Sequence, residues 1–559
     1  MRTRKVLRRG LLAAAVAGGV LLTGCSGSGG SGASDDRATA DGKGRQHGAA
    51  PLPGPASGTG DAAPGEDGRR AEIAPSPDYL STFALDVDTA SYGYARRTLA
   101  EGRLPDPATV RPEEFVNSFR QDYPRPDGDG FSVSVDGART GDDGWSLVRV
   151  GLAMRGEAAE AERPPAALTF VIDVSGSMAE PGRLDLAKKS LGIMTDRLRP
   201  DDSIALVTFS DTAETVLPMT RLGGTGEGEK GGQGRTRAHR AIDGLEPTQS
   251  TNLEAGVTKG YDTAVLGRTA GATNRVVLLS DALANTGETS ADGILERISD
   301  ARRAYGITLF GVGVGSDYGD ALMERLADKG DGHTTYVSDV EEAREVFCER
   351  LPAHIELRAR DAKAQVAFDP ETVDRFRLIG YDNRAVADDD FRDDSVDGGE
   401  VGPGHTVTAL YAVRAKPGAT GHLATASVRW LDPESRTPHE ESGRIESGDL
   451  DGSLWRSDDG LQVSAIAAYF ADGLRQGVTG GQVEKYKVEK YQAEPLPGAP
   501  SLTELAARAR RLSAQGKPVR ELATAIDQAA RLTATATAPA PESTPSPRGE
   551  IRPGESLAG

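Results

Sequence analysis

The sequence predicts an α/β protein built around a doubly wound, mostly parallel sheet, with smaller N-terminal and C-terminal α+β regions before and after it in the chain. Two observations favour this fold class. Short apolar runs rich in β-branched residues recur between residues 166 and 350, and runs without a polar face are typical of strands covered on both sides. The segments between them place apolar residues at helical spacing, and strands that alternate with helices in this way form parallel sheets.

The first strand leads into a loop of oxygen-bearing side chains. Residues 167–172 form the apolar run, Asp173 follows it, and Ser175 and Ser177 occupy alternate positions after that. Ligands bind outside the carboxyl ends of the strands in such sheets, and clustered hard oxygens suit Mg²⁺ or Mn²⁺. The loop is therefore predicted to bind a metal ion. A helix is expected to follow, with one apolar face made by Leu184, Ala187, Leu191, Met194 and Leu198.

This Asp-x-Ser-x-Ser pattern after a buried strand resembles the first metal loop of von Willebrand factor A (VWA) domains. The resemblance implies the rest of that family's metal-ion-dependent adhesion site. Thr251, within Ser-Thr-Asn-Leu-Glu-Ala-Gly, matches the second-loop threonine, and Asp281, which follows the apolar run 276–279 and Ser280, matches the third-loop aspartate. The chain departs from the family after Asp281, where Ala282 replaces the usual glycine and its β-carbon would change the loop. The implied metal-site residues are Asp173, Ser175, Ser177, Thr251 and Asp281.

The other elements of the VWA-like domain are expected between residues 166 and 350. A glycine-rich stretch at 223–234 interrupts the pattern. It does not fit a phosphate-binding loop, because Lys230 is followed by Gly231 and not by Ser or Thr, so we expect a disordered surface insertion. Helical spacing is predicted over 294–305 and 340–347. The remaining strands are predicted at 204–209, 276–279, 307–314 and 334–337.

The N-terminal residues have the pattern of an export signal. Basic residues precede an apolar run at 11–22. Thr23 and Gly24 follow this run and lead directly to Cys25. The run is too short for a stable membrane span, and Cys25 resembles the site where bacterial lipoproteins are cleaved and diacylated. We therefore expect a signal peptide over 1–24, a lipid on Cys25 and a disordered tether over 25–75. The protein would be anchored at the extracytoplasmic face of the cell membrane; a plain signal peptide with a chance cysteine is the alternative.

The composition is acidic and poor in cysteine. The 559 residues carry a net charge of −19, and removal of a leader with five basic residues would make it −24. Such a charge argues against nucleic acid as a partner and against anionic lipid held by charge alone. If Cys25 is lipidated, Cys348 has no partner within the chain. The fold is therefore expected to stand without disulfides, with Cys348 as a small buried residue on the last helix of the domain.

Two regions flank the VWA-like domain. The region 76–165 resembles the N-terminal segment of a family of VWA-containing bacterial lipoproteins. The region 351–532 resembles the uncharacterised domain that follows the VWA module in those lipoproteins, through its phrases at 376–384 and 404–411. The tail at 533–559, rich in Pro, Ser, Thr and Ala, is expected to be disordered.

Two acidic stretches in the flanking regions do not fit metal sites. Asp86 and Asp88 are followed by Ala90, where a hydroxyl ligand would be needed, so a structural role is favoured. The loop at 388–398 imitates the start of a calcium loop. Its twelfth position is Gly404, where a calcium loop requires a bidentate glutamate. A solvated acidic loop is the better interpretation.

Three functions remain for the predicted metal site. In the favoured one, Ser175, Ser177 and Thr251 bind Mg²⁺ (with Mn²⁺ or Ca²⁺ as alternatives), Asp173 and Asp281 act largely through waters, and a protein partner supplies a carboxylate as the last ligand. A metal-assisted hydrolase would use a bound water as nucleophile. No histidine or glutamate has an evident base role and no catalytic motif is present, so an enzyme is not expected. The third is a structural cell-envelope protein whose stabilising or vestigial site ties three loops together.

Overall fold

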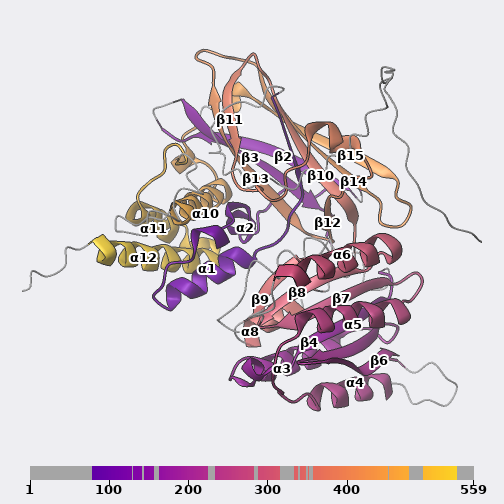
Figure 1. Cartoon of the computed structure of the whole chain (residues 1–559). Coiled ribbons are helices and arrows are strands. Elements are labelled where there is room, and N and C mark those ends of the chain that lie inside the picture. The colour runs from indigo at the N-terminus through magenta and orange to yellow at the C-terminus, as the bar shows by residue number, and fades with distance from the viewer. Residues whose placement is uncertain are drawn as a thin grey trace, which may run out of the picture. The chain divides into compact units, whose positions relative to one another are not determined.

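The computed structural model describes most of the chain from residue 79 to residue 537 (Figure 1). The signal peptide, Cys25, the tether, Cys348 and nearly all of the glycine-rich insertion lie outside the described residues. Within them, no helix is both long and apolar enough to cross a membrane. The described residues are 79–126, 128, 130–141, 144–156, 163–223, 233–281, 288–314, 326, 333–337, 340–347, 351, 357–450, 452–476 and 495–537.

The central domain, residues 163–351, contains a six-stranded sheet with the order β6-β5-β4-β7-β8-β9. Its strands pair in parallel from β5 to β9, and only the edge strand β6 is antiparallel. This confirms the predicted fold class and all of the predicted strands. The sequence pattern does not predict β6, because most of its residues are exposed or half-buried. The strands are β4 (Ala166–Asp173), β5 (Ser203–Phe209), β6 (Ala213–Arg221), β7 (Thr273–Ser280), β8 (Thr308–Val314) and β9 (His333–Val337).

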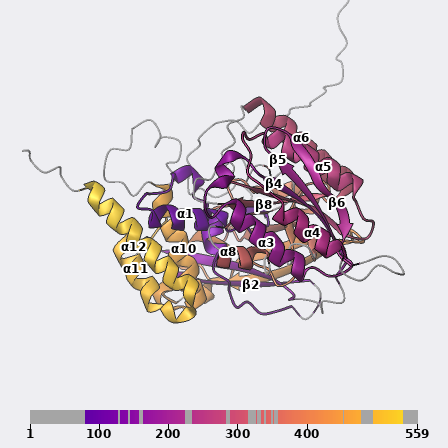
Figure 2. The same ribbon diagram turned by 90° about the horizontal axis from the view of Figure 1, so that it is seen from below.

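Helices cover both faces of this sheet (Figure 2). Phe170 and Ile172 of β4 belong to one core with α3, α4 and α8. Val171, whose side chain points the other way, packs in a second core with α5 and α6. The apolar run of β4 is therefore buried on both sides, as its sequence predicts. The helices are α3 (Leu184–Arg197), α4 (Gln233–Asp243), α5 (Leu253–Leu266), α6 (Glu288–Tyr305) and α8 (Val340–Glu345).

The segments before and after the central domain form one flanking body, residues 79–156 and 357–537. Its two antiparallel sheets have the orders β1-β10-β14-β15, with β12 paired to β10, and β11-β13-β3-β2. Strand β1 pairs with β10, and β3 pairs with β13, so each sheet contains strands from both sides of the central domain. The strands are β1 (Leu80–Ala84), β2 (Phe131–Arg139), β3 (Trp145–Met154), β10 (Ala359–Phe368), β11 (Val373–Leu378), β12 (Gly399–Val401), β13 (Thr406–Ala415), β14 (His422–Leu431) and β15 (Pro438–Glu446).

Strand β3 shows how the flanking body is layered. Val148 and Val150 face a core that the two sheets share, whereas Leu147 faces a core made with the helices. Ser501 and Glu504 form a capping box at the start of the helix Leu502–Arg511. The next helix, Lys517–Thr537, continues past residue 533, so the prediction that the disordered tail begins there is wrong for residues 533–537. The helices are α1 (Ala90–Ala100), α2 (Pro112–Asn117), α10 (Asp459–Arg475), α11 (Leu502–Arg511) and α12 (Lys517–Thr537).

Asp86 and Asp88 have the structural role that the sequence favours. Both side chains are buried, and the Arg384 guanidinium lies 3.1 Å from the carboxylate of Asp86 and 3.8 Å from that of Asp88. Asp88 also accepts a hydrogen bond from the Thr334 backbone N–H of β9, at 3.2 Å. Asp88 therefore connects the flanking body to the central sheet.

The loop that imitates a calcium site surrounds an ammonium group of the protein itself. The Nζ of Lys363, a residue of β10 that is 1% exposed, donates to the backbone carbonyls of Asp390, Asp393 and Val396. The Asp393 carboxylate points to solvent and accepts hydrogen bonds from Ser395. The inward-facing carbonyls of this loop thus bind a lysine ammonium group in place of a calcium ion. This agrees with the sequence, because the loop lacks the bidentate glutamate that a calcium site requires.

Candidate functional site

The candidate site lies at the carboxyl end of β4, next to β5 and β7. Asp173, the last residue of β4, is fully buried. Its Oδ1 accepts a hydrogen bond from the Ser175 N–H at 2.8 Å, and its Oδ2 accepts one from the Ser280 Oγ at 2.6 Å. Ser280 ends β7, the neighbouring strand. One oxygen of the carboxylate is therefore held by the first loop and the other by the end of β7.

The two serines of the first loop lie together. Ser175 is 1% exposed and its Oγ is 3.1 Å from the Oγ of Ser177, which is half-buried. A short 3₁₀ helix, η2 (Gly176–Ala179), makes the turn that brings them together. The alternating spacing seen in the sequence thus gives a compact group of hydroxyls beside the Asp173 carboxylate.

The second loop is held in place on both sides of Thr251, by the first loop before it and by the end of β5 after it. Before it, the Thr248 N–H donates to the Val174 carbonyl at 2.6 Å. After it, the Asn252 N–H donates to the Ser210 carbonyl at 2.6 Å, and the Asn252 side chain caps α5 by accepting from Ala255. Thr251 is half-buried between these anchors. Its loop therefore lies against the Asp173 loop, as the resemblance implies.

Asp281 has a partner that the sequence analysis missed. Arg183, which directly precedes α3, places its Nη1 2.6 Å from the Asp281 Oδ2 and 3.1 Å from the Ser177 carbonyl. Both side chains of this ion pair are nearly fully buried, at 5% and 4% exposed. The only local signal was a single basic residue just before an apolar helix, and nothing in the sequence identified a partner 98 positions away.

The electrostatics of the site favour a cation. Burial raises the pKa of Asp173, the hydrogen bonds from Ser175 and Ser280 oppose that rise, and the charge of Asp281 adds to it. A positive charge among these oxygens would favour the ionised form of Asp173. Arg183 supplies one positive charge on the Asp281 side of the site.

The donor set fits a hard divalent cation. It consists of carboxylate and hydroxyl oxygens, without the sulfur or imidazole nitrogen that softer metals prefer. No group of three or more His, Cys, Asp or Glu side chains that could hold a metal occurs within the described structure, so the hydroxyls are essential to this site. The residues after Asp281, including Ala282, lie outside the described ranges. The residues that would hold the ion are Asp173, Ser175, Ser177, Thr251 and Asp281.

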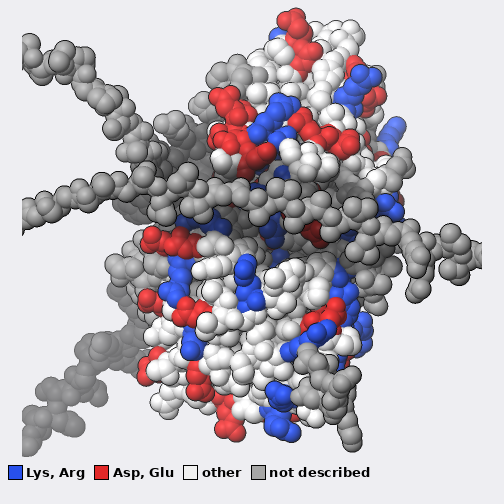
Figure 3. Space-filling view, turned by 90° about the vertical axis from the view of Figure 1, so that its right-hand side faces the viewer, with Lys and Arg blue, Asp and Glu red and all other residues white. Residues whose placement is uncertain are grey.

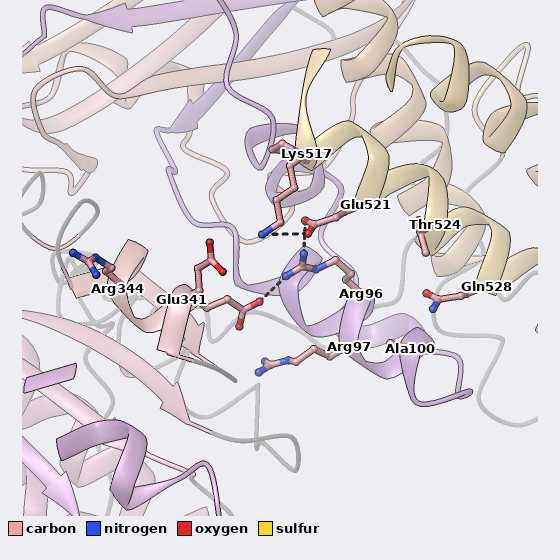
Figure 4. A pocket seen from close by; sticks show the side chains of 11 residues that line it. Arg96, Arg97, Ala100, Glu341, Arg344, Lys517, Glu521, Thr524 and Gln528 are labelled. Atoms are coloured by element: carbon pink, nitrogen blue, oxygen red, sulfur yellow. Dashed lines mark hydrogen bonds and ion pairs between the residues drawn. The ribbon is translucent and has the colours of Figure 1, made fainter. Parts of the chain in front are cut away.

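A separate cavity of about 630 Å³ lies between α1, α8 and α12 (Figure 4). Arg96 points into it and forms ion pairs with Glu342 at 2.7 Å and with Glu521 at 2.5 Å. Lys517 lies 3.8 Å from the same Glu521. These charges pair with one another across the junction between central domain and flanking body, so the cavity offers no single-sign surface to a ligand. Acidic and basic side chains are also interspersed on the face shown in Figure 3.

Comparisons with known proteins agree with this organisation. The model of the von Willebrand factor type A domain matches residues 167–349, the model described as "Uncharacterized protein YfbK, C-terminal" matches 355–497, and one described as "von Willebrand factor" matches 69–144. The uncharacterised protein YfbK of Escherichia coli (strain K12) is 32% identical over 394 residues, which are 65% of this chain and 66% of that protein. A UPF0353 protein of Mycobacterium sp. (strain KMS) is 26% identical over 230 residues, 36% of this chain and 65% of that protein. The chain thus spans just under two thirds of these relatives.

Two solved structures are also similar. A von Willebrand factor type A protein from Catenulispora acidiphila covers 63% of this chain and 80% of its own, with a TM-score of 0.39 and 16% identity. The ArnB paralog VWA2 from Sulfolobus acidocaldarius covers 73% of this chain and 99% of its own, with a TM-score of 0.35 and 14% identity.

Proposed function

Because this chain is a von Willebrand factor type A domain protein of the YfbK family, we propose that its central domain binds a divalent cation and, through it, a carboxylate of a protein partner. The observation that carries the proposal is the fixed carboxylate of Asp173, which lies beside two hydroxyls and close enough to a second carboxylate, Asp281, for their charges to interact. Von Willebrand factor type A domains commonly bind a divalent metal at this position.

Each residue has a distinct role in the proposal. Ser175, Ser177 and Thr251 offer neutral hydroxyl oxygens as direct ligands, while Asp173 and Asp281 act largely through waters. Mg²⁺ retains several waters in such sites and is the preferred ion, with Mn²⁺ or Ca²⁺ as alternatives. The ion supplies an open coordination position for an anionic oxygen. The chain's own contribution is to hold three loops in place and to leave few negative charges in direct contact with the ion.

We propose no catalytic role for this site. The hydrogen-bond partners of Asp173 are Ser175 and Ser280, and neither provides a base for activating a water. A structural function is the second candidate, and one observation favours it. The Arg183 and Asp281 ion pair joins the first and third loops without any metal. The site would then stabilise the domain, and no partner would depend on it.

The proposal extends to the location of the protein. A lipid on Cys25 would place the central domain at the extracytoplasmic face of the membrane, within reach of cell-envelope proteins. Residues 25–75 would act as the tether. The two acyl chains of a diacylglycerol would make this attachment stable, since one chain alone gives only marginal binding.

Binding of Mn²⁺ tests the proposal directly, because free and bound Mn²⁺ differ in their electron paramagnetic resonance. We expect the unmutated protein to bind Mn²⁺, and we expect Mg²⁺ to compete with it. Acetate should displace a water molecule from the bound Mn²⁺. This displacement should lower the relaxation enhancement of water protons. Asp173→Ala should abolish binding. Asp196→Asn removes an exposed carboxylate of α3 and should leave it unchanged. Mn²⁺ binding without any effect of acetate would favour the structural function.

A further inference from the structure

Arg183 holds a position between the first and third loops of the site. Its Nη1 donates to the Asp281 Oδ2 at 2.6 Å and to the Ser177 carbonyl at 3.1 Å, and its Nη2 lies 2.8 Å from the Glu180 Oε2. The guanidinium is 5% exposed, whereas Glu180 is 64% exposed. Water therefore screens the charge of Glu180, and the charge of Arg183 acts mainly on the buried site.

The position of Arg183 changes the formal charge of the site. The carboxylates of Asp173 and Asp281 carry two negative charges, and the buried guanidinium carries one positive charge. A divalent cation would then leave the site with one net positive charge. Without the guanidinium, the same site would be neutral when loaded.

We propose that Arg183 determines the ligand specificity of the site, by making its loaded form cationic so that it selects an anionic oxygen ligand over a neutral one. This inference rests on the proposed function. The same charge has the opposite effect on the metal, because it repels the ion and occupies an oxygen of Asp281. Arg183 thus lowers the affinity of the site for the metal and raises its selectivity for a carboxylate.

The two opposite effects distinguish this role from a merely structural one. Loss of a loop contact would weaken the binding of metal and of acetate together. Loss of a specificity-determining charge should tighten the metal and weaken acetate. Two guanidinium nitrogens of Arg183 contact three groups, the carboxylates of Asp281 and Glu180 and the carbonyl of Ser177. A lysine at this position would retain the charge but could not make all of these contacts.

The experiment compares the unmutated protein with Arg183→Gln, Arg183→Lys and Arg197→Gln, the last removing an exposed arginine from the end of α3. Mn²⁺ affinity is measured by electron paramagnetic resonance, and acetate and acetamide are each titrated into the loaded protein. For Arg183→Gln we expect Mn²⁺ to bind on the order of tenfold more tightly and acetate on the order of tenfold more weakly, since one unscreened charge readily changes an affinity by that factor. Arg183→Lys should keep the preference for acetate, and Arg197→Gln should match the unmutated protein.

The outcomes separate this inference from the function on which it rests. If no form binds Mn²⁺, the proposed function fails and the inference fails with it. If Mn²⁺ binds but Arg183→Gln leaves both affinities unchanged, or weakens both, the inference alone is overturned. Should Arg183→Gln not fold, the unmutated loaded protein decides the matter, because equal affinity for acetate and acetamide would contradict a site selective for anions.

Discussion

Arg275 and Glu400 form a buried ion pair that joins the central domain to the flanking body. The Arg275 Nη2 on β7 lies 3.0 Å from the Glu400 Oε2 on β12, and the two side chains are 0% and 4% exposed. Two other nitrogens of Arg275, Nε and Nη1, have no hydrogen-bond partner in the described structure. Burial lowers the pKa of Arg275, and the charge of Glu400 opposes that change. Glu400 is therefore the main compensation for a charge held away from water.

Removal of Glu400 should be costly. Glu400→Gln leaves the guanidinium buried without its counter-charge, and breaking such a pair costs about 3 to 5 kcal/mol. Urea unfolding monitored by circular dichroism measures the loss. The matched control is Asp300→Asn, which breaks an exposed pair with Arg303 and should change the free energy of unfolding by less than about 1 kcal/mol. Equal effects of the two substitutions would show that the junction does not depend on the buried pair.

Helix α5 should tolerate no side chain at Gly260. A β-carbon there would lie 2.3 Å from the Val171 Cγ2 of β4, so α5 would have to move away from the strand that leads to Asp173. We expect Gly260→Ala to cost about 1 to 3 kcal/mol through overpacking. Gly192→Ala in α3 is the control. Its nearest neighbour beyond the helix is 3.9 Å away, so the gain in helix propensity should stabilise the protein by up to about 1 kcal/mol. Thermal unfolding of both variants tests this difference in sign.

Glu113 should make stability depend on pH. Burial raises the pKa of this carboxyl from 4.5 to about 7 in the folded protein. Between these two values the folded state keeps the proton and the unfolded state loses it, so the free energy of unfolding should fall as pH rises from 4.5 to 7. The loss is at most about 3 kcal/mol. Glu113→Gln, which cannot ionise, should remove this part of the pH dependence. Parallel stability curves for the two proteins over this range would contradict the assignment.

The sequence predicts the parallel strands of the central sheet and the first loop of the candidate site because both depend on local patterns, whereas Thr251 and Asp281 were assigned from the family resemblance. The run that ends at Asp173 is apolar on both faces, and the hydroxyls of Ser175 and Ser177 follow within four residues. The strand and its loop can therefore be recognised together. The flanking body is different, since β3 and β13 pair across the whole central domain and no local pattern records that partnership. The role of Arg183 was not predicted for the same reason. Its partner Asp281 is distant in the chain, and a lone arginine before a helix has no distinctive pattern.

Anchoring through Cys25 remains a prediction from the sequence. Cys25→Ser should release the protein from the membrane fraction or leave it unprocessed, because the substitution removes the thiol that would receive the lipid. Fractionation and mass measurement of the N-terminus test this. A control at Cys348, Cys348→Ser, should leave fractionation unchanged. Processed protein that remains in the membrane fraction after Cys25→Ser would exclude the lipid anchor.

The central claim is that Asp173, Ser175, Ser177, Thr251 and Asp281 form a divalent-cation site, and calorimetric melting with and without Mg²⁺ tests it most directly. An ion that binds only the folded state should stabilise the protein by about 2.7 kcal/mol at a concentration one hundred times its Kd. Asp173→Ala should remove most of that gain, and Thr251→Ala should reduce it less, because that variant deletes one neutral ligand. The account predicts a rise in melting temperature for the unmutated protein that Asp173→Ala does not show. No rise with Mg²⁺, Mn²⁺ or Ca²⁺ for the unmutated protein would contradict it.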